Sequence, residues 1–191
     1  GEIEGDTVAG IIGNSSGNLK LSDCENNGAI NGRYSAGGIA QCIENKNSNE
    51  AEVSNCINNG NVFGGAEAAG IIDYAEGITV TNCINNGNIS SNGYVGGIFS
   101  YTSSVKGTGL VNNGKISGLE DIGGISAYDE GNSIFSKLYN TGVIDEENIG
   151  AQVSNLVKLG ESSTGEELEE EHKHDYVASS TVTKATTEKD G

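Results

Sequence analysis

One seven-residue phrase returns through this chain at a nearly fixed interval, and it constrains the fold more than any other feature. The phrase reads Cys-Ile-Asn-Asn-Gly-Asn-Ile at residues 83–89, and variants of it occupy residues 24–30, 56–62, 110–116 and 138–144. Cutting the chain at Gly1 and at the glycine of each phrase gives units of 27, 32, 27, 27 and 28 residues, followed by an incomplete sixth. A repeat of this length, with apolar positions kept in register, is the signature of a solenoid.

Each unit carries three short stretches that we expect to be extended. The first is Gly-x-Ile, as at residues 28–30; the second is a small-residue run ending in Ile, as at residues 69–72; the third precedes the cysteine of the phrase, as at Val53 and Val80. Turn-forming Ser, Asn, Gly and Asp separate the three stretches. This arrangement predicts an all-β fold, a right-handed parallel β-helix of about five to six turns with three short strands per turn.

The composition agrees with a narrow, stacked interior. Thirty glycines, no proline, no tryptophan and only three phenylalanines make an ordinary mixed core improbable. We expect Gly and Asn at bends with positive φ, and we expect the paired glycines before Ile to mark a wall that is closely approached. Ser91 and Glu146 replace glycine after the first stretch of their units, where packing should be less tight. Residues 45–50 lengthen the second unit and are expected to form a loop between the second and third strands.

Two repeat positions predict columns of stacked side chains. The first asparagine of the phrase should form a ladder in which each amide donates to one neighbour and accepts from the other; its members are Asn26, Asn58, Asn85, Asn112 and Asn140. The cysteine position is held by Cys24, Cys56 and Cys83 and later by leucine, so we expect reduced thiols in a core ladder. Parallel stacked side chains suit the disulfide dihedral poorly. Cys42 lies outside this ladder.

The charge excludes several functions. A formal net charge of −17 argues against binding nucleic acid or anionic membrane surfaces, which require a basic footprint. No apolar stretch is long enough to span a bilayer. Acidic positions do not recur from unit to unit, as repeated calcium sites would require, and His172 and His174 lack a third ligand nearby. We therefore expect no metal and no cofactor, although calcium binding stays open.

The sequence also predicts no catalytic centre. Sugar cleavage by acid and base would need two carboxylates at a defined separation on one face. The candidates are Asp73 with Asp129, or Glu120 and Asp121 near Asp145. None is accompanied by a cation suited to hold a uronate, and exposed, solvated acids are the favoured interpretation.

The chain divides into three parts. Residues 1–158 are the predicted β-helix, with residues 154–159 expected to close its open end, because an exposed terminal turn invites pairing with another chain. Residues 159–171 are an acidic linker too poor in apolar residues to fold alone. Residues 172–191 begin another module, so we expect this sequence, which has no initiator Met, to be an excised or processed segment.

The Gly-x-Ile-x-Gly and Ala-Gly-Gly-Ile positions of residues 1–150 resemble the GLUG-motif repeats of bacterial surface proteins. Such repeats occur in adhesin-like proteins and beside the catalytic region of surface metallopeptidases. The tail at residues 174–191 resembles the start of short repeats found in Gram-positive cell-surface proteins. The resemblance implies an extracellular, surface-displayed bacterial protein, and it supplies no catalytic residues within the repeats.

We therefore expect a non-catalytic, structural or adhesive stalk segment that is a monomer. One alternative is a glycan-binding module, in which exposed tyrosines stack on sugars; the candidates are Tyr34, Tyr94, Tyr101 and Tyr128, and Tyr94 and Tyr101 are the pair expected to share a face. Another is an accessory β-helix of a larger surface peptidase or polysaccharide-degrading enzyme. A host or matrix glycan or protein is the candidate partner.

Overall fold

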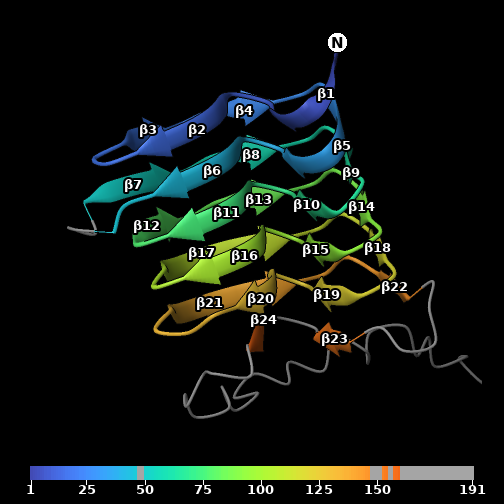
Figure 1. The fold of residues 1–191 in the computed structure, drawn as a ribbon. Helices are drawn as coiled ribbons and strands as arrows, with labels where there is room; N and C mark the ends of the chain where they lie inside the picture. Colours follow the sequence, from blue (N-terminus) through green and yellow to red (C-terminus); the bar gives the residue numbers. More distant parts are fainter. Residues whose placement is uncertain (47–49, 147–151, 155–156, 160–191) are drawn as a thin grey trace, which may run out of the picture.

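The chain folds into a parallel β-solenoid whose turns lie one above another (Figure 1). The computed structural model describes residues 1–46, 50–146, 152–154 and 157–159. All strand pairing within these residues is parallel, and three sheets run along the stack. The predicted parallel β-helix is confirmed. The acidic linker beyond Leu159 and the tail with His172 and His174 lie outside the described residues.

Sheet A is bent, because most turns contribute two strands to it on either side of a corner. Its hydrogen-bonded order is β22-β18-β14-β9-β5-β10-β15-β19-β23, with β1 pairing β5. Its strands are β1 (Glu2–Ala9), β5 (Ala29–Gly37), β9 (Val62–Gly64), β10 (Glu67–Ala69), β14 (Ile89–Ser91), β15 (Tyr94–Gly96), β18 (Ile116–Gly118), β19 (Asp121–Gly123), β22 (Ile144–Glu146) and β23 (Gln152–Ser154).

Sheets B and C complete each turn. Sheet B contains β2 (Ile12–Ser16), β6 (Ala40–Glu44), β11 (Ile72–Glu76), β16 (Phe99–Ser103), β20 (Ser126–Asp129) and β24 (Val157–Leu159). Sheet C contains β3 (Lys20–Ser22), β4 (Glu25–Asn26), β7 (Ala51–Ser54), β8 (Ile57–Asn58), β12 (Ile78–Thr81), β13 (Ile84–Asn85), β17 (Lys106–Asn112) and β21 (Ile134–Asn140). β6 ends at Glu44 and β7 begins at Ala51, so the insertion expected at residues 45–50 falls between these two strands, and its residues 47–49 lie outside the described residues.

The register of the strands follows the sequence repeat. Ile30 pairs with Val62, Val62 with Ile89, and Ile89 with Ile116, so equivalent residues form columns along the stack. Pairing continues beyond the fifth unit, since β23 adds to β19 and β24 adds to β20. The first and third expected stretches form strands of sheets A and C. The small-residue run is a corner instead, because β10 ends at Ala69 and β11 begins at Ile72.

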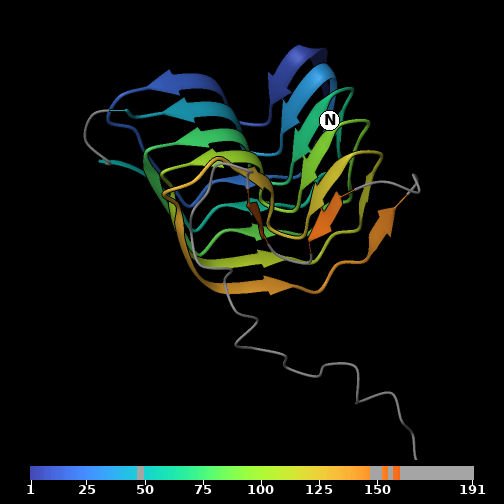
Figure 2. The same cartoon turned by 60° about the horizontal axis from the view of Figure 1, so that its bottom comes forward.

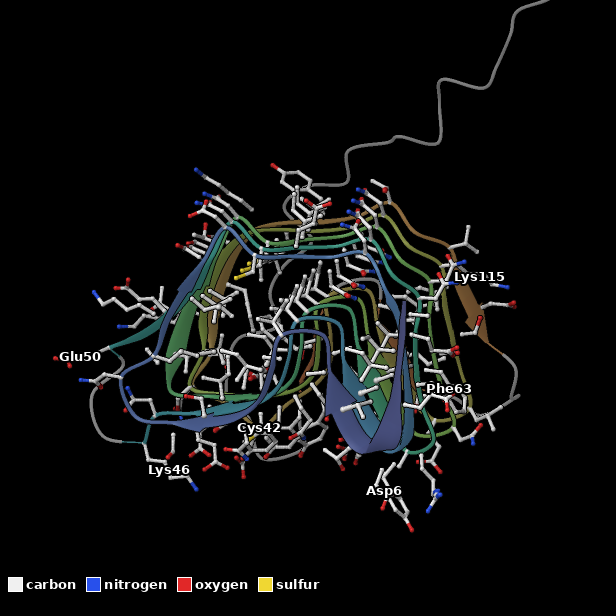
Figure 3. The ribbon with its side chains drawn as sticks, turned by 90° about the horizontal axis from the view of Figure 1, so that it is seen from above. Asp6, Cys42, Lys46, Glu50, Phe63 and Lys115 are labelled. Carbon is white, nitrogen blue, oxygen red and sulfur yellow. The ribbon has the colours of Figure 1, made fainter. Side chains whose placement is uncertain are left out.

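This corner turns inward and divides the interior into two lobes, which Figure 2 and Figure 3 show side by side. A Cβ on Gly70 would lie 2.4 Å from Cγ of Asn85, and one on Gly97 would lie 2.7 Å from Cγ of Asn112. The wall therefore touches the asparagine ladder across the interior, as the paired glycines predicted. One core packs between sheets B and C and includes Val53, and the other packs inside sheet A around Ile30.

The asparagine ladder runs through the whole stack. Each Nδ2 donates to Oδ1 of the next asparagine, at 2.7 Å from Asn26 to Asn58 and at 2.8 Å for the steps to Asn85, Asn112 and Asn140. Each amide from the first four members also donates to the carbonyl of the glycine two residues on. Within the described part of the chain, no buried side-chain nitrogen or oxygen lacks a hydrogen-bond partner.

The cysteine column also occurs as predicted. Cys24, Cys56, Cys83 and Leu110 follow one another at one position of successive turns, because the next strand's N–H donates to each cysteine carbonyl. All four cysteines of the chain are free thiols. Cys56 and Cys83 are fully buried, and a hydrogen bond that the Cys83 thiol donates to Cys56, together with burial, raises the pKa of Cys83 above its ordinary value.

Candidate functional surfaces

Asp73, one of the two acids considered for sugar cleavage, is fully buried rather than solvated. Its carboxylate accepts hydrogen bonds from the Ser100 hydroxyl and from Nε2 of Gln41 at 3.3 Å. Burial raises the pKa of Asp73 to about 6, against the opposing effect of the Ser100 hydrogen bond. Gln41 lies in β6 and Ser100 in β16, on either side of β11. The Asp73 carboxylate therefore links three neighbouring strands of sheet B next to the corner with sheet A.

Asp129 lies in a different column from Asp73, and its buried carboxylate likewise accepts hydrogen bonds from neighbouring hydroxyl groups. Its Oδ1 accepts a hydrogen bond from Thr102 at 2.9 Å and another from Ser133, and the residue is 2% exposed. Burial raises the pKa of Asp129. Asp73 and Asp129 therefore do not face one another as an acid and base pair, and the expectation that both are exposed is wrong.

The other acids considered for sugar cleavage lie on opposite sides of the bend in sheet A. Asp121 begins β19, whereas Asp145 belongs to β22 and its Oδ2 lies 2.6 Å from Nζ of Lys115. Within residues 1–46, 50–146 and the two short strands that follow, no three His, Cys, Asp or Glu side chains form a group that could hold a metal.

Tyrosines form a column on the outer side of sheet B. Tyr74, Tyr101 and Tyr128 occupy one register position in β11, β16 and β20. The rings of Tyr74 and Tyr101 are stacked with centroids 4.8 Å apart and planes 7° from parallel, and Tyr101 stacks on Tyr128 at 5.4 Å. Tyr94, from sheet A, makes an edge-to-face contact with Tyr128, with ring centroids 5.9 Å apart. Two sheets thus contribute to one aromatic cluster.

This stacking decides which parts of the rings are accessible. Both faces of Tyr101 are covered, so its edge and hydroxyl are the parts that meet solvent. Tyr74 donates from its hydroxyl to Glu76 at 3.0 Å, and burial raises the pKa of Tyr74 and Tyr101, with Glu76 and Glu130 adding to the rise. A sugar stacks on an open ring face. Glycan contact through Tyr94 and Tyr101 stays a prediction, but the covered faces of Tyr101 do not favour it.

Of the four tyrosines considered as glycan contacts, Tyr94, Tyr101 and Tyr128 belong to this cluster and Tyr34 does not. Tyr34 is 58% exposed and takes no part in the ring contacts of the cluster. Tyr74 was not predicted, although it lies one 27-residue repeat before Tyr101, and that spacing was the signal that could have found it.

Cys42 continues the tyrosine column by one turn, since it pairs with Tyr74. Its side chain is 8% exposed, and burial, with Glu44 adding to it, raises the pKa of the thiol to about 11. A thiol with a raised pKa is a poor nucleophile at neutral pH, because the thiolate is the reactive form. Cys42 is therefore a packing residue.

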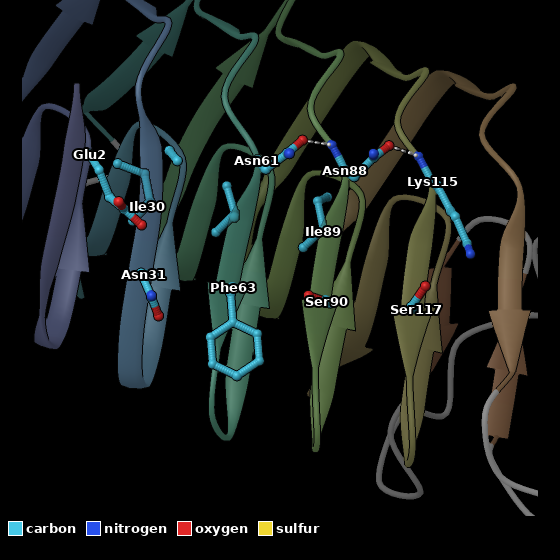
Figure 4. A pocket seen from close by; sticks show the side chains of 12 residues that line it. Glu2, Ile30, Asn31, Asn61, Phe63, Asn88, Ile89, Ser90, Lys115 and Ser117 are labelled. Carbon is cyan, nitrogen blue, oxygen red and sulfur yellow. Dashed lines mark hydrogen bonds between the residues drawn. The ribbon is translucent and has the colours of Figure 1, made fainter.

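A second surface lies on the outer side of sheet A, where residues of successive turns line a hollow of about 380 Å³; Figure 4 shows their side chains. Two columns border it. Asn31, Phe63, Ser90 and Ser117 lie at one register position of β5, β9, β14 and β18. Asn61, Asn88 and Lys115 lie in the turns before β9, β14 and β18. Phe63 is 41% exposed and extends from the middle of the hollow.

The asparagines of the second column are held in place by the backbone. Oδ1 of Asn61 accepts the backbone N–H of Asn88 at 3.0 Å, and Oδ1 of Asn88 accepts that of Lys115 at 3.1 Å. The amide oxygens are thereby used, and the Nδ2 groups have no acceptor among the described residues. The sequence pattern did not single out this surface, because the column holds Asn31, Phe63, Ser90 and Ser117 and so does not repeat one residue type through the units.

Comparison of the chain with protein families, with curated proteins and with solved structures gives no match. The resemblance to GLUG-motif repeats accordingly stays a prediction. The part of the chain that the structure describes holds no helix with the length and apolar character needed to cross a membrane.

Proposed function

We propose that this chain is a non-catalytic spacer segment of an adhesin-like, GLUG-repeat protein on the outside of a bacterial cell, where it acts as a monomer. The observation that carries the proposal is the asparagine ladder, which links Asn26 to Asn140 through every intervening turn. A spacer needs turns that support their neighbours equally along the whole length, and a stacked solenoid provides this.

The buried acids support the same interpretation. Asp73 and Asp129 are each satisfied by hydroxyl or amide donors and lie in different columns, so they serve the fold. The alternative of a polysaccharide-degrading or peptidase accessory is tested by incubating the chain with polyuronates and with peptide substrates. We expect no unsaturated sugar product and no cleavage.

Pulling the two ends of the chain apart in a single-molecule force experiment tests the spacer. We expect resistance followed by unfolding in steps that correspond to whole units, each releasing about 90 Å of contour length for 27 residues. A matched variant lacks residues 60–86, which form one complete unit, and it should show one step fewer. Smooth extension at low force, as for a flexible linker, would contradict the proposal.

The location is tested separately. Antibodies raised against the folded chain should label intact, unpermeabilised cells of the source bacterium. Labelling that requires permeabilised cells would place the protein inside the cell and refute surface display, whatever the result of the force experiment.

A further inference from the structure

We propose that the outer face of sheet A around Phe63 binds a neutral, extended polysaccharide that lies along the axis of the stack. The inference does not depend on the spacer function, since it rests on the hollow that spans β5, β9, β14 and β18 (Figure 4). The volume of about 380 Å³ is within the range of sites for small ligands.

Phe63 supplies the apolar element of the site. Its neighbours in the column are Asn31 and Ser90, among the described residues no other ring stacks on it, and its side chain is 41% exposed. This differs from Tyr101, whose ring is covered on both sides. Aromatic rings with exposed faces provide large contact area with little entropy loss, and they pack against the apolar C–H face of a sugar ring.

Polar side chains share this face with Phe63. Among the described residues the Nδ2 donors of Asn61 and Asn88 have no acceptor, while their oxygens are held by the backbone. The side chains of Asn31, Ser90 and Ser117 lie beside them on the same face. Preset amides and hydroxyls that can both donate and accept suit a ligand rich in hydroxyl groups.

The charge of the face favours a neutral ligand. Asn31, Phe63, Ser90 and Ser117 carry no charge, in a chain whose formal net charge is −17. The cation at the border, Lys115, is already paired with Asp145 at 2.6 Å. Glu2 is the acid that lines the hollow, and it would repel a uronate or sulfated chain, while Lys115 is already neutralised by Asp145.

The geometry favours a polymer over a protein partner. Equivalent atoms recur with the strand spacing of about 4.8 Å, which is close to the length of one sugar residue in an extended chain. β9 and β14 have hydrogen-bonded neighbours on both sides, so a peptide cannot add to them as a further strand. One exposed aromatic ring is also far less than the contact area of about 1,000 Å² that a stable protein interface requires.

Calorimetric titration of the full chain with neutral hexasaccharides tests the site, using the hexamers of β-linked glucose, N-acetylglucosamine and mannose and of α-linked glucose. We expect at least one to bind with a Kd of about 10⁻⁴ to 10⁻³ M. Phe63→Ala should weaken this binding by about tenfold or more, whereas Phe63→Tyr should retain it. The matched control is Tyr139→Ala, which removes a half-exposed ring from sheet C and should leave binding unchanged.

Amide NMR spectra of the parent chain locate the contact without relying on any variant. We expect shift changes confined to β9, β14, β18 and the turns that precede them. The proposal is overturned if no neutral hexasaccharide binds, if Phe63→Ala binds as the parent does, or if the shifts fall elsewhere. Tighter binding of a hexagalacturonate than of every neutral probe would also overturn it.

Discussion

Replacing Asn85 by alanine tests whether the asparagine ladder holds the turns together. Asn85 is fully buried; its Nδ2 donates to Asn112 at 2.8 Å and to the Gly87 carbonyl at 2.7 Å, and its Oδ1 accepts from Asn58 at 2.8 Å. The substitution removes all three hydrogen bonds and leaves buried partners that water cannot reach. With about 1 kcal/mol for each bond and a further penalty for the orphaned groups, the free energy of unfolding should fall by about 3 to 5 kcal/mol.

The neighbouring residue provides a matched control. Asn86 belongs to a second, exposed column, in which its Nδ2 donates to Asn59 at 2.8 Å and its Oδ1 accepts from Asn113 at 2.9 Å. Water replaces these contacts when they are lost, so Asn86→Ala should lower the free energy of unfolding by less than about 1 kcal/mol. Both variants replace a stacked asparagine by alanine, and they differ in whether that asparagine is buried or exposed.

Urea denaturation followed by circular dichroism measures both variants, and the dependence of stability on urea should stay unchanged if the folded turns are retained. A loss for Asn85→Ala that is no larger than the loss for Asn86→Ala would refute the reasoning. In that case the ladder would be a consequence of stacking and not a source of stability.

Three further substitutions test the corner, a buried acid and the aromatic column. Gly70→Ala places a Cβ about 2.2 Å from the Gly97 carbonyl oxygen in the next turn, so it should prevent folding or cost more than about 3 kcal/mol of stability. A Cβ at Gly13 meets nothing within 4 Å, so Gly13→Ala should be nearly neutral. Thermal unfolding of the two variants distinguishes these outcomes. Because burial raises the pKa of Asp73 to about 6, the native state holds its proton more tightly than the unfolded chain, and ionisation opposes folding. Asp73→Asn should therefore gain up to about 3 kcal/mol relative to the parent as pH rises from about 4 to about 7, and a difference that does not change with pH would contradict this. Tyr101→Ala removes two ring contacts and should cost about 2 to 4 kcal/mol in urea denaturation, while Tyr101→Phe keeps the rings and should cost less than about 1.

The repeat period was sufficient to predict which residues stack. Asn58, Asn85 and Asn112 share a column because the units between them have equal length, and the same argument applies to the cysteines. The period does not specify the path of the chain within one turn. The run at residues 69–72 reads as a strand by composition, but it is the corner that brings the wall against the ladder.

The bends show how far residue type alone could predict the backbone. Positive φ occurs at Asn and Gly, as expected, but the recurring left-handed position directly before the phrase, held by Asn55, Asn82 and Gly109, is also held by Asp23 and Lys137. Gly60 is required for another reason, because a Cβ there would lie 1.9 Å from the carbonyl oxygen of Gly28 in the turn above. Close stacking, rather than backbone conformation, demands glycine at that position.

The two asparagine columns show how such a stack balances its polar groups. The buried column donates toward the C-terminal end, from Asn58 to Asn85, whereas the exposed column donates toward the N-terminal end, from Asn86 to Asn59. Their amide dipoles therefore oppose one another, and adding a turn lengthens both without building up a net dipole. The asparagines that hold the turns together are the same in every unit, while the column through Phe63 holds Asn, Phe and Ser, and this variation is compatible with the ligand surface proposed above.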